Sequence, residues 1–363
     1  MTSELRVEMF DDLLAGSQLG VLSGASTFPG AFESWVRMVL AEHGPLQLVD
    51  PEDVGATFSP DAQAVCVGMV GSLPALYEMP FRGDEARTAV HDLERMRGTT
   101  FACMAALNAA GVNVLIAVAA ACQLRLPLLN CDGQGQILPL IDQTTYKLAG
   151  LSPAPLVGVG PWGDIIAVRS PLARAETLTR AAVSGAGGWL VTAMYPALVS
   201  QLAAAGIPGA ITRCIEAGST LRSSRGQLGS RLARQLGGRI LGRGRVLEIT
   251  QHRESGIRTR PPAQPLSILL EVSGSTQSEI RLEVRNEVVL ATLDGAVAAV
   301  APDVICLLDP LRRRTVDLLD LKLGDVMEVL LLPAHELWHT LAGVQLAGPS
   351  SFGLPIAYRK PTL

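Results

Sequence analysis

The sequence predicts an α/β domain followed by a β-rich domain. A chain of 363 residues exceeds what one hydrophobic core usually serves, so we expect two domains. Apolar runs of strand length alternate with helix-like segments in the first half, which favours a mostly parallel sheet with helices on both faces. Short alternating runs separated by turns follow Gly237 and indicate a small β-rich domain. We place the boundary after residue 170, so that 1–170 carries the active-site loops and 171–363 holds a helical connection and the β-rich domain.

Each element of the first half follows from the spacing of its apolar residues and from the turn residues that bound it. In order, we expect helices at 7–15 and 31–43, strands in LQLVD and AVCVGMVG, a helix at 84–97, a strand at 113–117, a short helical piece, and a strand at 126–129.

The second half changes character twice. Alanine- and leucine-rich faces predict helices from Ala173 to about Leu236, with a break at Gly206 and Pro208. The runs GRVLEIT, SILLEVSG, IRLEVRNEVVLAT, DVICLLD and DVMEVLLLP then predict strands.

Composition limits the classes of partner. The net charge of −4 is small for this length, and the basic run at 312–314 is typical of a solvated turn, so we expect no nucleic acid partner. The charge-free stretches 98–124 and 181–212 are interrupted by polar residues, glycine or proline, which predicts no membrane span. Six scattered cysteines and a first segment without signal-peptide form indicate a cytoplasmic protein with reduced thiols. We expect a small-molecule substrate and a homo-oligomer.

Polar residues that follow apolar runs form the candidate site. Asp132 stands between a strand and a glycine-containing loop, where open α/β sheets present reactive groups to small ligands. Glu78, Asn108 and Asn113 also follow or end apolar runs, so the sheet is expected to bring them to the same edge. For each residue alone, a capping or turn role is the simpler interpretation.

Three glycine-containing loops supply candidate substrate-binding residues. The first follows Asp132 and carries Gly133, Gln134, Gly135 and Gln136. In VGVGPWGD, the ring of Trp162 offers a stacking surface, although a turn at a domain boundary explains the glycines equally well. In SGASTFPG, Ser26 and Thr27 precede a helix, where free backbone N–H groups can bind a polar ligand atom.

Two further motifs suggest different chemistry. HELWH, with His335, Glu336 and His339, matches the HExxH pattern of zinc peptidases, but no third ligand follows it in the sequence. The simpler interpretation is the first turn of a helix. Cys131 adjoins Asp132 and is a candidate nucleophile, but it has no neighbouring histidine. We therefore assign no metal ligands, and the cofactor stays unknown because no convincing ligand set supports a divalent metal.

The order of these motifs resembles the S-methyl thiohydantoin desulfurase-like family, which is associated with hydantoinase and oxoprolinase proteins. The resemblance runs from about Met9 to Tyr358. Its matching segments are VGMVGSLPALYE, AGVN, LPLLNCDGQGQILP, AAAGIPGAITRCIEAGSTL, IRLEVRNEVVLAT, APDVICLLD, LKLGDVMEVL and AGPSSFGLPIAY.

The resemblance implies an N-terminal α/β domain, a β-rich C-terminal domain, and hydrolytic chemistry on small five-membered nitrogen rings. We expect an enzyme that performs hydrolytic or lyase-type chemistry on a small nitrogen-containing ring or cyclic amide at the interdomain cleft. The resemblance implies that Asp132 activates water or holds a metal that does, and that Glu78 and Asn113 orient the ring or stabilise developing negative charge. This chain departs from the family pattern in three places. LSGASTFPG replaces a glycine run followed by aspartate, Asn108 occupies a usually acidic position, and Gln136 replaces an arginine. A catalytically inactive relative that binds a small molecule or a partner subunit is the alternative, followed by a zinc metallopeptidase.

Overall fold

A computed structural model describes residues 3–20, 30–171, 174–224, 226–251, 266–274, 278–285, 287–316, 318 and 320–360. The chain divides into two compact units, each with its own sheet. The first unit contains Met1–Ser17, Thr27–Gly135 and Leu140–Ile215, and the second contains Gln18–Ser26, Gln136–Pro139 and Glu216–Leu363. By these contacts the first unit continues to Ile215; the boundary that we placed after residue 170 stays a prediction.

Among the described residues, the sheet of the first unit has four parallel strands, with antiparallel strands on both sides of them. Its strand order is β1-β2-β5-β4-β3-β8-β6-β7, and β9 pairs with β5. The parallel strands are β2 (Leu46–Val49), β5 (Leu128–Asp132), β4 (Cys103–Ala106) and β3 (Gln63–Gly71). The antiparallel strands are β1 (Ser3–Leu5), β8 (Trp189–Leu198), β6 (Leu156–Val159), β7 (Ile165–Val168) and β9 (Ile207–Pro208).

Alternate residues of β3 face two separate hydrophobic cores. Val65 and Val67 pack into one core, whereas Ala64 and Cys66 pack into the other. Because both faces of the strand are buried, it reads as a continuous apolar run, as parallel strands usually do. The predicted α/β domain with helices on both faces is confirmed.

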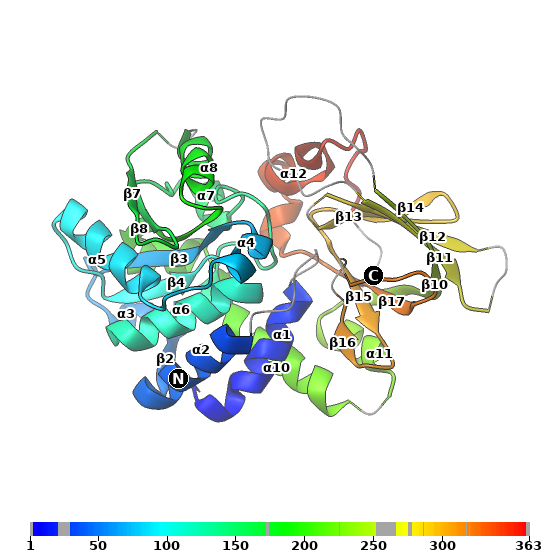
Figure 1. Ribbon diagram of the computed structural model, residues 1–363, viewed down its shortest axis with the longest axis horizontal. Coiled ribbons are helices and arrows are strands. Elements are labelled where there is room, and N and C mark those ends of the chain that lie inside the picture. The colour runs from blue at the N-terminus through cyan, green and yellow to red at the C-terminus, as the bar shows by residue number, and fades with distance from the viewer. Residues whose placement is uncertain are drawn as a thin grey trace. The chain divides into compact units, whose positions relative to one another are not determined.

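The helices of the first unit are α1 (Phe10–Ser17), α2 (Gly30–His43), α3 (Val54–Thr57), α4 (Leu73–Glu78), α5 (Glu85–Arg97), α6 (Gly111–Leu124), α7 (Thr145–Leu148), α8 (Ala175–Gly185) and α9 (Val199–Ala205), and α10 (Ala210–Ser223) begins in it. Figure 1 shows α2 and α6 on one side of this sheet. No helix in the described part of the chain is long and apolar enough to cross a membrane.

Two predicted elements of this unit were wrong. Residues 113–117 lie in α6 and do not form a strand. The prediction failed because a helix that is buried on every side lacks the polar face whose 3.6-residue period identifies a helix. Residues 189–198 form strand β8 within the segment that we expected to be helical. Its run WLVTAMY is rich in aromatic and β-branched residues, which favour a strand over a helix.

In the part of the second unit that the structure describes, eight strands form one sheet in which every pair is antiparallel. Its order is β14-β13-β12-β11-β10-β17-β15-β16. The strands are β10 (Arg239–Gln251), β11 (Leu266–Val272), β12 (Glu279–Val284), β13 (Val288–Leu293), β14 (Ala296–Val300), β15 (Val304–Asp309), β16 (Arg314–Thr315) and β17 (Val326–Leu332). The second unit also contains helices α11 (Leu228–Gln235) and α12 (Leu341–Ala347). The predicted β-rich second domain is confirmed.

Asp303 joins three segments of the second unit. Its Oδ1 accepts a hydrogen bond from the backbone N–H of Ala334 at 2.9 Å and lies 2.9 Å from His339 Nε2. Its Oδ2 accepts a hydrogen bond from the hydroxyl of Tyr358 at 3.0 Å. The Asp303 side chain is buried and its three partners are half-buried, so water can replace the lost bonds only in part.

We therefore expect Asp303→Ala to lower the free energy of unfolding by about 3 kcal/mol. Tyr358→Phe removes only one of the three bonds and should cost about 1 kcal/mol. Urea unfolding of both variants beside the parent protein measures the difference. Equal stabilities for Asp303→Ala and the parent protein would show that Asp303 does not hold these segments together.

Candidate functional site

The carboxyl edge of the parallel strands carries the candidate site. The chain leaves β4 at Ala106, passes Asn108, and begins α6 at Gly111. The N-cap residue of α6, Ala110, provides no side-chain hydrogen bond to the first turn of that helix. The positive end of the helix dipole therefore faces this edge without a side-chain cap, next to the point where β5 ends at Asp132.

Asp132 connects the loops that follow β4 and β5. Its Oδ2 accepts a hydrogen bond from the backbone N–H of Ala109 at 2.6 Å. Its Oδ1 accepts bonds from the backbone N–H groups of Gly135 at 2.6 Å and Gln134 at 3.1 Å. The residue is only 1% exposed, and this burial raises the pKa of its carboxyl group, while the three N–H groups and the charge of Arg213 act in the opposite direction. Asp132 is thus a buried carboxylate that orders two loops.

Three side-chain amides form a continuous chain beside this carboxylate. Asn113 accepts a hydrogen bond from the backbone N–H of Met69 in β3 at 2.7 Å, and its Nδ2 donates to Asn108 Oδ1 at 3.2 Å. Asn108 Nδ2 then donates to Gln134 Oε1 at 2.6 Å. All three amides are buried and uncharged. This amide chain, Asn113–Asn108–Gln134, connects the ends of β3, β4 and β5.

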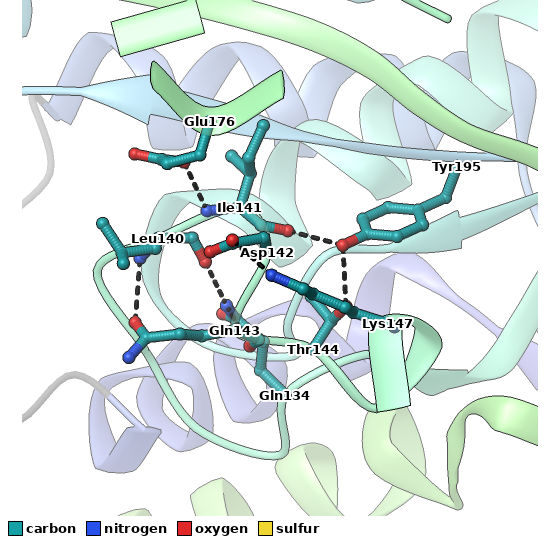
Figure 2. Close-up of polar contacts among 9 residues, drawn as sticks. All are labelled: Gln134, Leu140, Ile141, Asp142, Gln143, Thr144, Lys147, Glu176 and Tyr195. Atoms are coloured by element: carbon teal, nitrogen blue, oxygen red, sulfur yellow. Dashed lines mark hydrogen bonds and ion pairs between the residues drawn. The ribbon is translucent and has the colours of Figure 1, made fainter. Parts of the chain in front are cut away.

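The turn formed by residues 140–144 supports the far end of the amide chain. Figure 2 shows Gln134 directed at this 140–144 turn, where its Nε2 donates to the carbonyl oxygens of Gln143 at 3.0 Å and Leu140 at 3.3 Å. Gln143 in turn accepts a hydrogen bond from the backbone N–H of Leu140 at 3.1 Å. Tyr195 of β8 contacts the same turn through its hydroxyl group. Gln143, Thr144 and Tyr195 were not predicted from the sequence, since no local motif relates β8 to a loop that precedes it by some fifty residues.

Family models identify the chain. The model for the S-Me-THD-like N-terminal domain matches residues 9–170, and the model for the S-Me-THD-like C-terminal domain matches residues 170–361. The chain belongs to the S-Me-THD-like family. The resemblance seen in the sequence is therefore confirmed.

The fold is also similar to that of a protein whose structure has been solved. The crystal structure of a protein from Chromobacterium violaceum superposes with a TM-score of 0.77 at 19% sequence identity, covering 99% of both chains. At this identity the likeness shows the fold alone. A search of curated proteins finds no match.

The structure brings together only part of the residue set predicted for this S-Me-THD-like protein. Glu78, at the end of α4, is exposed, and Trp162, in the turn between β6 and β7, is 74% exposed. Trp162 follows β6, and strands β3 and β8 lie between β4 and β6 in the sheet. At the usual strand spacing, the ends of β4 and β6 are therefore about 14 Å apart. A small ring bound at the amide chain would therefore not reach Trp162. The roles assigned to Glu78 and Trp162 stay predictions.

The remaining predicted residues differ in their surroundings. Gly133 has no room for a larger residue, because a Cβ atom there would lie 2.6 Å from the Tyr146 ring. Gly135 has a φ of +70°, which favours glycine. Gln136 is buried and donates a hydrogen bond to the carbonyl oxygen of Pro302 at 2.6 Å, so its amide is bound within the second unit. Ser26 and Thr27 lie outside the described residues.

The HELWH motif of this S-Me-THD-like chain does not have the geometry of a zinc peptidase. Residues 336–339 form a 3-10 helix, whereas the HExxH arrangement needs an α-helix to place both imidazoles on one face. His339 Nε2 contacts Asp303, and His335 Nδ1 accepts a hydrogen bond from the backbone N–H of Leu337 at 3.4 Å. Across the residues that the structure describes, no three His, Cys, Asp or Glu side chains gather as metal ligands would.

The cysteines are free and buried. Burial and the neighbouring Asp132 carboxylate both raise the pKa of the Cys131 thiol. A thiol in this environment is a poor source of thiolate, which opposes the nucleophile hypothesis for Cys131.

Proposed function

We propose that this protein is a small-molecule enzyme that performs hydrolytic or lyase-type chemistry on a small nitrogen-containing ring or cyclic amide. The amide chain Asn113–Asn108–Gln134 is the observation that carries the proposal. Carboxamides both donate and accept hydrogen bonds, so they complement the N–H and C=O groups of a cyclic amide without requiring a charged ligand. Membership in the S-Me-THD-like family supports the same class of substrate.

For a ring that carries a methylthio group, the proposed reaction is a substitution by water. The water oxygen bonds to the ring carbon and the C–S bond breaks. One proton of the water leaves with methanethiol, the other moves to the adjacent ring nitrogen, and the ring carbon becomes a carbonyl. Negative charge develops in the tetrahedral intermediate of this reaction. We propose that the N-terminal N–H groups of α6 stabilise its charge, because the helix dipole there is positive.

Asp132 is the proposed proton acceptor in this reaction. A carboxylate whose pKa is raised by burial is a stronger base than an exposed one, and Asp132 has this environment. Asn113, which belongs to the amide chain, keeps the role that the family resemblance implies for it, to orient the ring or to stabilise developing negative charge.

The test is a thiol-release assay with an S-methyl thiohydantoin. Methanethiol is measured with a thiol-reactive dye, and the carbonyl product is identified by mass spectrometry. We expect release above the spontaneous rate, and a decrease of kcat/KM by about tenfold or more for Asn108→Leu, which interrupts the amide chain.

Gln123→Leu is the matched control for this assay. Gln123 also carries a carboxamide, but it donates to the carbonyl oxygen of Gly83 at 2.9 Å, away from the amide chain. Its variant should keep the parent rate. Release no faster than in buffer, or an Asn108→Leu variant as active as the parent protein, would contradict the proposal.

A catalytically inactive binding protein is the second candidate, and the geometry of Asp132 favours it. Both carboxylate oxygens already accept backbone hydrogen bonds, so activation of water requires one of these bonds to lengthen. Calorimetric binding of the same ring without thiol release would support this candidate over the enzyme.

A further inference from the structure

Tyr195 has an unusual backbone conformation for its position. Five non-glycine residues in the described part of the chain have a positive φ, namely Arg125, Tyr195, Gln227, Asp294 and Arg313. The other four lie at helix ends or in turns, whereas Tyr195, with a φ of 52°, lies inside β8. A left-handed conformation costs a residue with a Cβ atom about 1–2 kcal/mol. The surrounding contacts must offset this cost.

A shift in strand register accompanies this conformation. Ala64 pairs with Ala197, but Cys66 pairs with Met194, so β8 contains one more residue than β3 over this interval. Such a bulge changes the direction in which a side chain points. At Tyr195 it accompanies a fully buried phenol group whose hydroxyl reaches the 140–144 turn.

The hydroxyl group of Tyr195 makes two hydrogen bonds to that turn. It donates to the carbonyl oxygen of Ile141 at 2.7 Å and accepts from Thr144 Oγ1 at 2.8 Å (Figure 2). The carbonyl groups of Leu140 and Gln143, which flank these contacts, bind the side chain of Gln134. One short turn therefore contacts Tyr195 on one side and the amide chain on the other.

We propose that Tyr195 is a positioning residue for the candidate site. Its hydroxyl group fixes the 140–144 turn, and the turn fixes the direction of the Gln134 amide, which holds Asn108. Tyr195 itself touches no ligand in this scheme. The inference rests on the proposed function, because it assigns Tyr195 to the same site.

Tyr195→Phe tests the inference because it removes only the hydroxyl oxygen. In the thiol-release assay we expect KM to rise about fivefold to tenfold with kcat changed less than about twofold, since the misdirected amides hold substrate and transition state equally poorly. A general loss of folded protein would lower kcat and leave KM unchanged, so the split separates positioning from simple destabilisation.

The second readout does not depend on turnover. In protein labelled with ¹⁵N-glutamine, the side-chain NH₂ signal of Gln134, identified by its loss in Gln134→Leu, should shift or broaden in Tyr195→Phe. Tyr146→Phe is the matched control. Tyr146 is equally buried and its ring centre lies 5.3 Å from that of Tyr195, but its hydroxyl makes no hydrogen bond to the 140–144 turn as the structure describes it.

The outcomes separate the two proposals. If the parent protein releases no thiol, the proposed function fails while the Gln134 signal still decides the role of Tyr195. An unchanged Gln134 signal in Tyr195→Phe, or unchanged KM in an active protein, would overturn the positioning role.

Discussion

Asp132→Ala is expected to lower the free energy of unfolding by about 3–5 kcal/mol and to reduce thiol release to the spontaneous rate. The backbone N–H groups of Ala109, Gln134 and Gly135 would all lose the acceptor that the buried Asp132 carboxylate provides. The two loops that carry the amide chain would then lose the group that joins them. Chemical unfolding and the thiol-release assay measure the two effects on the same preparation.

Asp132→Asn is a less selective test, although asparagine and aspartate have nearly the same shape. One carboxylate oxygen would become an NH₂ group, which would face a backbone N–H that needs an acceptor. Asp164→Ala provides the control, because Asp164 is an exposed aspartate in the turn between β6 and β7. If Asp132→Ala unfolds at the same urea concentration as the parent protein, Asp132 does not order the loops.

Glu287→Gln is expected to stabilise the second unit at alkaline pH. The carboxyl group of Glu287 is buried, and this burial raises its pKa from 4.5 to about 8. Its Oε2 atom has no hydrogen-bond partner among the described residues. Because the folded state binds the proton more tightly than the unfolded state, stability is fully present below about pH 4.5 and is lost as the pH rises to about 8.

The size of this loss of stability follows from the difference between the pKa values of Glu287 in the unfolded and folded states. Each pKa unit corresponds to about 1.4 kcal/mol, so the interval from 4.5 to about 8 sets an upper limit of about 5 kcal/mol. Glutamine cannot ionise, so the variant should show little of this pH dependence and should exceed the parent protein in stability at about pH 9.

Urea unfolding at several pH values between about 5 and 9 measures this effect. Glu279→Gln, which replaces an exposed glutamate of β12, controls for the change in net charge. Parallel pH profiles for Glu287→Gln and the parent protein would exclude Glu287 as the source of the dependence.

The fold class could be predicted from the sequence because most elements keep a clear period. The alternating runs of the second unit correspond to β10, β11, β12, β13, β15 and β17, and the helices at residues 10–17 and 30–43 lie where their apolar faces predict them. The errors fall on segments buried on all sides. In α6, the residues from Gly111 to Cys122 are all buried, so no polar face marks the helical period.

The candidate site was predictable only where its residues follow strands. Asp132, Asn108 and Gln134 meet at one edge because β4 and β5 are parallel neighbours, a relation that the alternation of elements already indicates. Tyr195 could not be found in this way, since its contact with the 140–144 turn depends on an antiparallel strand and on a register shift within it. Local sequence carries no information on either feature.

The absence of ionisable groups from the amide chain has a kinetic consequence. Carboxamides neither gain nor lose protons between about pH 3 and pH 11, so the strength with which Asn108, Asn113 and Gln134 hold a neutral ring should not vary with acidity. Any slope in a plot of log kcat/KM against pH would then report proton transfer alone, and added salt should leave the affinity for a neutral ligand almost constant.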